Sequence, residues 1–262
     1  MTDVLAELAA EARRRVDAMS AQVPLHEMRR AALESPAPEG FPFERALAAE
    51  GMSFICEVKK ASPSKGVIDP DFDYLSIAAD YEAAGASCIS VLTEPSRFLG
   101  DIRYLKEIAS RVSVPVLRKD FIVDGYMVYE ARAAGASAVL LICSILTEQE
   151  LTDLILLADS LGLSALVEAH DESEVGKAVS CGARIIGVNN RNLRDFSVDP
   201  LNCLRLRPLV PEDVLFVAES GISSRADVEA LEEGGVDAVL IGESLMRSED
   251  KGSKLDELRG RR

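Results

Sequence analysis

The amino-acid sequence predicts an α/β fold in which eight parallel strands close into a (β/α)8 (TIM) barrel, preceded by an N-terminal helical extension. The length of 262 residues suits one such barrel, which typically needs about 250. Four glycines, spaced 50, 47 and 53 residues apart, each follow an amphipathic stretch and precede an apolar run: Gly85, Gly135, Gly182 and Gly235. A doubly wound open sheet is the alternative, but no Gly-x-Gly-x-x-Gly motif follows the first strand.

The N-terminal extension comprises residues 1–47, ahead of the first predicted strand. Residues 2–20 and 24–32 have helical patterns, and a Pro-rich connection follows at residues 34–40. This segment is too short to form a domain of its own. We therefore predict a single domain over residues 1–262, in which the extension packs across one end of the barrel.

Eight apolar or β-branched runs account for the strands of the barrel. We predict them at residues 53–58, 86–91, 114–117, 136–141, 163–167, 183–188, 214–218 and 236–241. Helical patterns lie between strands at residues 75–84, 125–134, 148–160 and 225–233. Each repeated glycine is expected just after a helix end, in the left-handed backbone region that favours glycine. Apolar strands that alternate with helices indicate a parallel sheet buried on both faces, with right-handed crossovers.

The charge balance argues against some classes of partner. The chain has 29 Lys and Arg residues against 44 Asp and Glu residues, which gives a net charge of −15 at neutral pH. General binding of nucleic acid or of an anionic membrane requires a basic face, so neither partner is expected. An anionic small-molecule substrate would require only a local group of positive charges.

Cysteine usage and the first residues favour a cytoplasmic protein. The five cysteines form no C-x-x-C pair, and four lie in or beside apolar runs. This pattern favours buried free thiols in a reducing compartment over disulfides. The first residues lack an apolar signal core, and the chain contains no run of 18 apolar residues.

Polar and charged residues end several of the predicted strands. In (β/α)8 enzymes the reactive groups lie at the carboxyl ends of the strands, so these side chains are expected to converge at one mouth. Paired lysines and glutamates there perturb each other's pKa, as acid–base catalysis requires, although a ring of salt bridges that closes the barrel is the alternative. The groups are Glu57, Lys59, Lys119, Glu168, Asn189 and Glu219.

Glycine-containing loops after the last two strands favour a phosphate site. One loop reads Ser220-Gly221-Ile222-Ser223, and the other begins Gly242-Glu243. Glycine lets backbone N–H groups face an anion, although ordinary turns could also use it. We expect the amide of Glu243, not its carboxylate, to face the phosphate. The loop at residues 60–70, with Lys60 and Lys65, is either a mobile cover for the site or a solvated loop.

Two other candidate residues have weaker support as functional groups. His170 follows the fifth strand, but the chain has two histidines and no ligand spacing, so no metal site is expected. Cys56 lies between Ile55 and Glu57 and is interpreted as a buried thiol rather than a nucleophile. The residues therefore predict an enzyme without metal or cofactor that performs acid–base chemistry on a phosphorylated small molecule.

Seven motifs, in order along the chain, resemble the indole-3-glycerol phosphate synthase family. The similarity runs from about residue 1 to residue 248 and includes the extension. The motifs are Glu57-Val-Lys-Lys-Ala-Ser-Pro-Ser-Lys-Gly66, Leu92-Thr-Glu94 with Phe98 and Gly100, Leu117-Arg-Lys-Asp-Phe-Ile-Val-Asp124, Leu166-Val-Glu-Ala-His170, Gly187-Val-Asn-Asn-Arg-Asn-Leu193, Glu219-Ser-Gly-Ile222 and Ile241-Gly-Glu-Ser-Leu-Met246.

The resemblance implies a carboxy-lyase of tryptophan biosynthesis. This family closes 1-(2-carboxyphenylamino)-1-deoxyribulose 5-phosphate to indole-3-glycerol phosphate, with loss of CO2 and water. By resemblance, Lys119 is the general acid for ring closure, Glu168 is a second acid–base group, and Glu57 with Lys59 serves dehydration and substrate orientation. The other residues that match the family's catalytic and binding positions are Asn189, Ser220, Ser62, Phe98, Phe121, Arg191, Gly221, Gly242 and Glu243.

Within this match, Ser62 corresponds to a loop serine that meets the substrate carboxylate, and Arg191 to a substrate-binding arginine. Phe98 and Phe121 correspond to apolar walls around the anthranilate ring. Gly221, Gly242 and the Glu243 amide correspond to the phosphate site. One departure is Asp124-Gly125, where family members often have Asp-Pro; it lies at a helix start outside the chemistry.

Two alternatives remain at this level. A phosphoribosylanthranilate isomerase would require a cysteine base on the first strand and an aspartate on the fifth, where this chain has Glu168. A non-catalytic barrel that serves as a scaffold or binding subunit would lack catalytic groups, and none is missing here. We expect a monomer or a weak homo-oligomer, with other tryptophan-pathway enzymes as potential partners.

Overall fold

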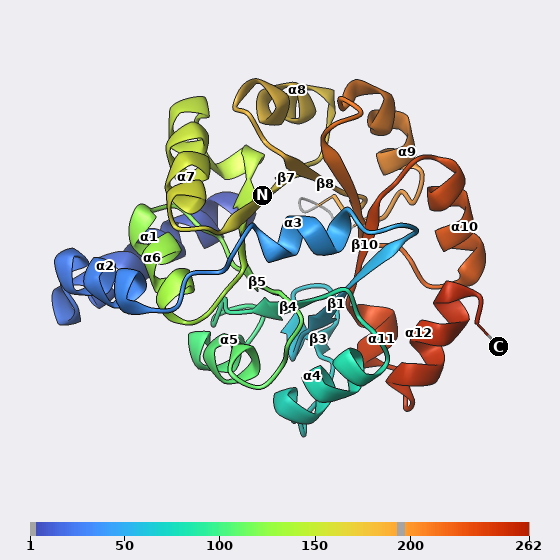
Figure 1. Ribbon diagram of the computed structural model, residues 1–262, viewed down its shortest axis with the longest axis horizontal. Helices are drawn as coiled ribbons and strands as arrows, with labels where there is room; N and C mark the ends of the chain where they lie inside the picture. Colours follow the sequence, from blue (N-terminus) through green and yellow to red (C-terminus); the bar gives the residue numbers. More distant parts are fainter. Residues whose placement is uncertain (1–3, 193–196, 262) are drawn as a thin grey trace.

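The computed structural model describes residues 4–192 and 197–261, in which eight parallel strands form a closed barrel (Figure 1). Strand β1 pairs with both β4 and β10, and this double pairing closes the sheet. The predicted barrel is therefore confirmed, and the open sheet is excluded. The barrel strands are β1 Ser53–Val58, β4 Cys88–Leu92, β5 Val116–Lys119, β6 Ala138–Ile142, β7 Ser164–Ala169, β8 Ile185–Asn189, β9 Leu215–Glu219 and β10 Ala238–Ile241.

Helices surround the strands on the outside of the barrel (Figure 1). They are α4 Tyr74–Ala83, α5 Ile102–Ala109, α6 Gly125–Ala133, α7 Glu148–Ser160, α8 Glu172–Ser180, α9 Asn202–Leu206, α10 Arg225–Glu233, α11 Glu243–Met246 and α12 Lys251–Arg259. Short 3-10 turns lie at η1 Cys143–Ile145 and η2 Arg207–Leu209, and a small hairpin at β2 Ala61–Ser62 and β3 Gly66–Val67. Thr2 and Leu193, which belong to predicted segments, lie outside the described residues.

Local sequence signals explain where these helices begin and end. Asp124 and Thr147 are examples of N-caps, because their side chains accept hydrogen bonds from backbone N–H groups in the first turns of α6 and α7. The four repeated glycines all have positive φ angles, between 74° and 88°, directly after the C-caps of α4, α6, α8 and α10. The left-handed glycine predicted after each of these helices is thus confirmed.

The N-terminal extension contacts both ends of the barrel, and not one end as predicted. It contains α1 Val4–Gln22, α2 Leu25–Glu34 and α3 Pro42–Leu47. Leu5 and Leu8 of α1 line the cavity at the carboxyl ends of the strands. Helix α2 packs against α6, and α3 lies at the amino ends, where Ser53 Oγ donates a hydrogen bond to the carbonyl of Ala46.

This path follows from the connection between the helices. After α2, the Pro-rich segment runs past the amino end of β7, where a Cβ on Gly162 would approach the carbonyl of Pro38 to 3.2 Å. Helix α3 then covers the amino end of the barrel with Phe43 and Leu47, both fully or nearly fully buried. The extension therefore leaves α1 at the end of the barrel where the predicted reactive groups lie.

Candidate active site

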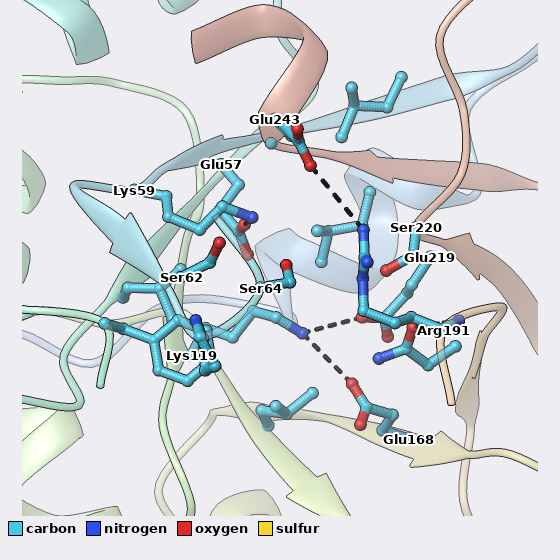
Figure 2. A pocket seen from close by; sticks show the side chains of 18 of the residues that line it. Glu57, Lys59, Ser62, Ser64, Lys119, Glu168, Arg191, Glu219, Ser220 and Glu243 are labelled. Atoms are coloured by element: carbon cyan, nitrogen blue, oxygen red, sulfur yellow. Dashed lines mark hydrogen bonds and ion pairs between the residues drawn. The ribbon is translucent and has the colours of Figure 1, made fainter. Parts of the chain in front are cut away.

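A cavity of about 360 Å³ opens at the carboxyl ends of the barrel strands. Its lining combines residues of α1, the β2–β3 hairpin and the loops that follow β4, β5, β8, β9 and β10. Every site residue named from the sequence lies in this lining: Glu57, Lys59, Ser62, Phe98, Lys119, Phe121, Glu168, Asn189, Arg191, Ser220, Gly221, Gly242 and Glu243. Figure 2 shows the charged members of this set facing one another across the mouth.

Lys119 forms the centre of the charged network. Its Nζ lies 2.8 Å from Glu219 Oε2 and 3.3 Å from Glu168 Oε2 (Figure 2). Burial lowers the pKa of Lys119, but the carboxylates of Glu219, Glu168 and Glu57 outweigh it and raise this pKa above its usual value. Lys119 therefore carries a proton into any reaction at neutral pH.

The alternation of side chains along β5 separates Lys119 from its neighbour Arg118. Arg118 points outward to α6, where its guanidinium lies 2.7 Å from the Glu130 carboxylate and donates a hydrogen bond to the carbonyl of Met127. Lys119 points inward to the mouth. Successive residues of a strand face opposite sides, so one basic residue binds the helical layer and the next enters the site.

The two carboxylates beside Lys119 differ in their tendency to ionise. Burial raises the pKa of Glu219 to about 7; Lys119 opposes this shift, and the negative charge of Glu168 adds to it. Burial also disfavours the charge of Glu168, but Lys119 and His170 outweigh that effect and lower its pKa. At neutral pH this pair therefore offers an ionised Glu168 beside a Glu219 that is close to its titration point.

A second ion pair lies on β1 and the residue after it. Lys59 Nζ approaches Glu57 Oε1 to 2.5 Å, and the Glu57 side chain is almost fully buried. Two glycines make room for the carboxylates of the site. A Cβ on Gly242 would collide with the Glu57 carboxylate and would lie 2.8 Å from Lys59 Nζ, and a Cβ on Gly187 would collide with that of Glu219.

The loop after β9, at the predicted phosphate end of the cavity, has an unusual backbone conformation. Ser220 and Gly221 both have left-handed φ angles, 65° and 79°. Such a conformation is strained for serine and is held here by Asn190, whose side-chain amide donates a 3.1 Å hydrogen bond to the carbonyl of Ser220. This backbone presents the residues after β9 toward the mouth.

The carboxylate of Glu243 is surrounded by basic side chains. It lies 3.2 Å from Arg247, 3.4 Å from Lys65 and 3.8 Å from Arg191. These contacts show how an acidic side chain is accommodated in this part of the cavity. They also bring Lys65, at the tip of the β2–β3 hairpin, to the mouth, which favours the loop at residues 60–70 as a cover for the site.

Aromatic and aliphatic side chains form the remaining wall of the cavity. The rings of Phe98 and Phe121 lie 6.2 Å apart, centroid to centroid. Glu94 fixes the loop that carries Phe98, because its carboxylate accepts hydrogen bonds from the backbone N–H groups of Arg97 and Phe98 at 2.8 and 3.0 Å. Asn189 acts similarly on the opposite side, where its Oδ1 accepts a 3.0 Å hydrogen bond from the N–H of Arg191.

Glu219 was expected at the mouth from its charge and its position at a strand end, but it was given no role in the reaction. Other residues of the site were not predicted from the sequence. Leu5 and Leu8 of α1, and Arg247 directly after α11, also line the cavity. Their sequence pattern is that of ordinary amphipathic helices, so it carried no signal of a role in the site.

None of the five cysteines lines the cavity. Cys56 is fully buried, and burial raises the pKa of its thiol to about 12, so it is not poised as a base or nucleophile. The five cysteines are free. Among the described residues, no three His, Cys, Asp or Glu side chains cluster as metal ligands would.

None of the helices in the described ranges has the length and apolar character needed to cross a bilayer.

The chain is similar over nearly its whole length to the members of one enzyme family. The family model described as "Indole-3-glycerol phosphate synthase" matches residues 5–258. The indole-3-glycerol phosphate synthase of Ruminiclostridium cellulolyticum is 52% identical over 257 residues, which cover 98% of this chain and 99% of that protein. The protein of the same name from Endomicrobium trichonymphae is 51% identical over 256 residues, again with 98% and 99% coverage.

Solved structures with low sequence identity share the fold. The 3-hexulose-6-phosphate synthase of Salmonella typhimurium has a TM-score of 0.66 at 17% identity, over 80% of this chain and 97% of that one. A mutant tryptophan synthase α-subunit from Pyrococcus furiosus has a TM-score of 0.59 at 14% identity, over 79% and 98%. At this level of identity the similarity establishes the barrel alone.

Proposed function

The chain belongs to the indole-3-glycerol phosphate synthase family, and from this premise we propose a role in the reaction for each residue of its site. The enzyme closes 1-(2-carboxyphenylamino)-1-deoxyribulose 5-phosphate to indole-3-glycerol phosphate, with loss of CO2 and water, in tryptophan biosynthesis. The main observation behind these roles is the position of the Lys119 ammonium group, which lies between the carboxylates of Glu168 and Glu219 at the barrel mouth.

The reaction sets a requirement for protons. Ring closure joins the ring carbon that bears the carboxylate to the ketone carbon, and the ketone oxygen takes up one proton. After CO2 leaves, the new hydroxyl group takes a second proton to depart as water, and the neighbouring carbon loses one. The site therefore needs two proton donations and one proton removal, which requires at least one acid and one base.

Lys119 is the general acid for ring closure in this proposal. Its ammonium group is protonated before the substrate binds, and it can stabilise the negative charge that develops on the ketone oxygen. Glu168, which is held ionised, removes the proton from carbon. The Glu57–Lys59 pair supplies the proton to the leaving hydroxyl group and orients the substrate.

The remaining residues position the two ends of the substrate. Phe98 and Phe121 enclose the anthranilate ring and keep water from its carboxylate, which facilitates loss of CO2. Ser62 binds that carboxylate, and Arg191 binds the substrate from the loop after β8. Asn189 and Ser220 support the polar network from the loops after β8 and β9. The backbone of Gly221, Gly242 and Glu243 binds the phosphate.

The rival isomerase activity has little support at this site. It would use a cysteine base on β1, but Cys56 is fully buried with a raised pKa. The position at the end of β7 holds Glu168, not an aspartate.

We also propose a cytoplasmic enzyme with a single domain over residues 1–262, monomeric or weakly self-associating, with other tryptophan-pathway enzymes as potential partners.

The direct test is to incubate the purified protein with the anilino-deoxyribulose phosphate and to follow indole fluorescence. Appearance of indole-3-glycerol phosphate with release of one CO2 per turnover is expected. A parallel assay with phosphoribosylanthranilate tests the isomerase. Turnover of that compound without formation of indole would overturn the proposal.

A further inference from the structure

His170 lies directly beside Glu168, although it is not part of the cavity lining. It follows β7, and its Nε2 lies 3.5 Å from Glu168 Oε1. On its other side, Nδ1 lies 3.0 Å from Glu174 Oε2. The imidazole is mostly buried, with 18% of the side chain exposed. The mechanism above assigns no role to this side chain.

The two oxygens of the Glu168 carboxylate are held by different cationic groups. Lys119 contacts Oε2 from the cavity side at 3.3 Å, and His170 faces Oε1 from the outer side at 3.5 Å. The His170 contact is an ion pair without a hydrogen bond, so it restrains the carboxylate through charge. The orientation of the carboxylate toward a substrate in the cavity therefore depends on both neighbours.

His170 is itself fixed from two further elements. Glu174 of α8 accepts a hydrogen bond from the His170 backbone N–H at 2.9 Å, in addition to its contact with the ring. Asn202 of α9 donates a hydrogen bond to the His170 carbonyl at 3.1 Å. These contacts fix the ring against Glu168 rather than leaving it free to turn toward solvent.

Three carboxylates from three elements act on His170. They are Glu168 on β7, Glu174 on α8 and Glu219 on β9. Burial lowers the pKa of His170, but the hydrogen bond that Glu174 accepts from the ring and the charges of these carboxylates outweigh it and raise the pKa above its usual value. The ring is thereby favoured as an imidazolium, with N–H donors on both sides.

We propose that His170 is a positioning residue for the reaction, which orients the Glu168 carboxylate through Oε1 and holds its negative charge opposite Lys119. This inference rests on the proposed role of Glu168 as the base that removes the proton from carbon. Glu174 completes the arrangement, because it holds the imidazole in place and in its charged form.

The decisive variant is His170→Asn, measured by kcat and KM across a pH series. Loss of the imidazolium removes a positive charge beside Glu168, so the acidic limb of the kcat profile should move to higher pH by roughly one unit. At neutral pH, kcat should fall by about 10-fold, while KM stays near its wild-type value, because His170 does not line the cavity. The matched control is His26→Asn, since the His26 side chain is 80% exposed on α2 beside Glu27.

Glu174→Gln separates charge from packing. This variant keeps a side chain of the same size but lowers the tendency of His170 to hold its proton. At low pH the kcat of Glu174→Gln should resemble that of the wild type. At higher pH it should approach the kcat of His170→Asn. A purely structural role for His170 would lower kcat without this dependence on pH.

Two outcomes distinguish the inference from the mechanism on which it rests. If Glu168→Gln retains near-normal kcat, the proposed role of Glu168 fails, and the role of His170 fails with it. If Glu168→Gln is inactive but a folded His170→Asn keeps the wild-type pH profile, only the role of His170 is overturned. Folding of each variant is checked by circular dichroism.

Discussion

Arg15 of helix α1 forms a two-point ion pair with Asp120, the residue that follows Lys119. The guanidinium nitrogens lie 2.6 and 3.2 Å from the two carboxylate oxygens, and the Asp120 side chain is fully buried. Asp120 also accepts hydrogen bonds from the N–H of Phe121 at 2.8 Å and from Thr93 Oγ1 at 2.7 Å. The N-terminal extension is thus tied to the short segment that carries both the proposed acid and one aromatic wall.

Arg15→Ala is expected to weaken both the fold and the binding of substrate. It removes two charge-assisted hydrogen bonds from a buried carboxylate that keeps Arg118 as a partner, so the free energy of unfolding should fall by about 2 kcal/mol. KM should rise, because α1 also lines the cavity with Leu5 and Leu8. Urea unfolding and steady-state kinetics measure the two effects.

Arg13 provides the matched control on the same helix. Its side chain is 50% exposed and lies 3.8 Å from Glu150, so Arg13→Ala should change stability by less than about 1 kcal/mol. An Arg15→Ala protein with the stability and KM of the Arg13→Ala protein would show that the ion pair to Asp120 does not matter.

Glu219→Gln tests the raised pKa of this carboxyl group. Because its pKa is about 7 in the folded protein, against 4.5 for an ordinary glutamate, the folded state retains a proton that the unfolded chain releases. The stabilisation from that proton is complete below about pH 4.5 and is lost as the pH rises through 7. The free energy of unfolding of the wild type, relative to Glu219→Gln, should therefore decrease between pH 5 and pH 8.

Urea unfolding of both proteins at these two pH values measures the difference in their free energy of unfolding. The kcat profile should also lose any limb near pH 7 in the variant, since glutamine does not titrate. A relative stability that is constant, or that increases with pH, would show that Glu219 is ionised throughout this range in the folded protein.

Much of the barrel and of its mouth could be predicted from the sequence because the signals are local. The apolar runs, the helix N-caps and the left-handed glycines each depend on a few neighbouring residues. Once parallel strands are inferred, residues at their carboxyl ends, such as Glu57 and Glu168, must lie at the same mouth. The closure of the barrel then brings Lys119 within hydrogen-bond distance of Glu219, which is 100 residues away in the sequence.

Features that depend on the path of the chain were not accessible in this way. The apolar stripe of α1 indicates burial, but nothing in its pattern tells whether Leu5 packs on a helix or lines a cavity. The route of the extension to both ends of the barrel depends on the Pro-rich connection between α2 and α3. The placement of His170 against Glu168 similarly requires the turn between β7 and α8, which no periodicity reveals.

Exhaustive dialysis against EDTA should leave turnover unchanged. The proposed steps move protons between Lys119, Glu168 and the Glu57–Lys59 pair, and positive charge at the site comes from lysine and arginine side chains. Indole fluorescence before and after dialysis measures the effect. Loss of activity that added Mg²⁺ or Zn²⁺ restores would assign a step of the reaction to a metal ion.

Lys119 and its neighbour Arg118 allow the general acid to be tested against an internal control. Lys119→Ala should lower kcat by ~10²–10⁴, the usual effect of losing a general acid, with a much smaller change in KM. Lys119→Arg should not restore kcat, because a planar guanidinium places its N–H donors differently from the compact ammonium group and gives up a proton even less readily than lysine. Steady-state fluorescence kinetics on folded variants, verified by circular dichroism, measure both effects.

Arg118 faces α6, so its removal should affect stability rather than chemistry. Arg118→Ala leaves the Asp120 and Glu130 carboxylates with one cation fewer, and loss of about 3–5 kcal/mol in the free energy of unfolding is expected. If that protein does not fold, Arg118→Lys, which keeps the charge, should fold with kcat close to the wild-type value. Near-normal kcat in a folded Lys119→Ala protein would instead move the acid role to Lys59 or Glu168, because both line the same cavity and carry a titratable group.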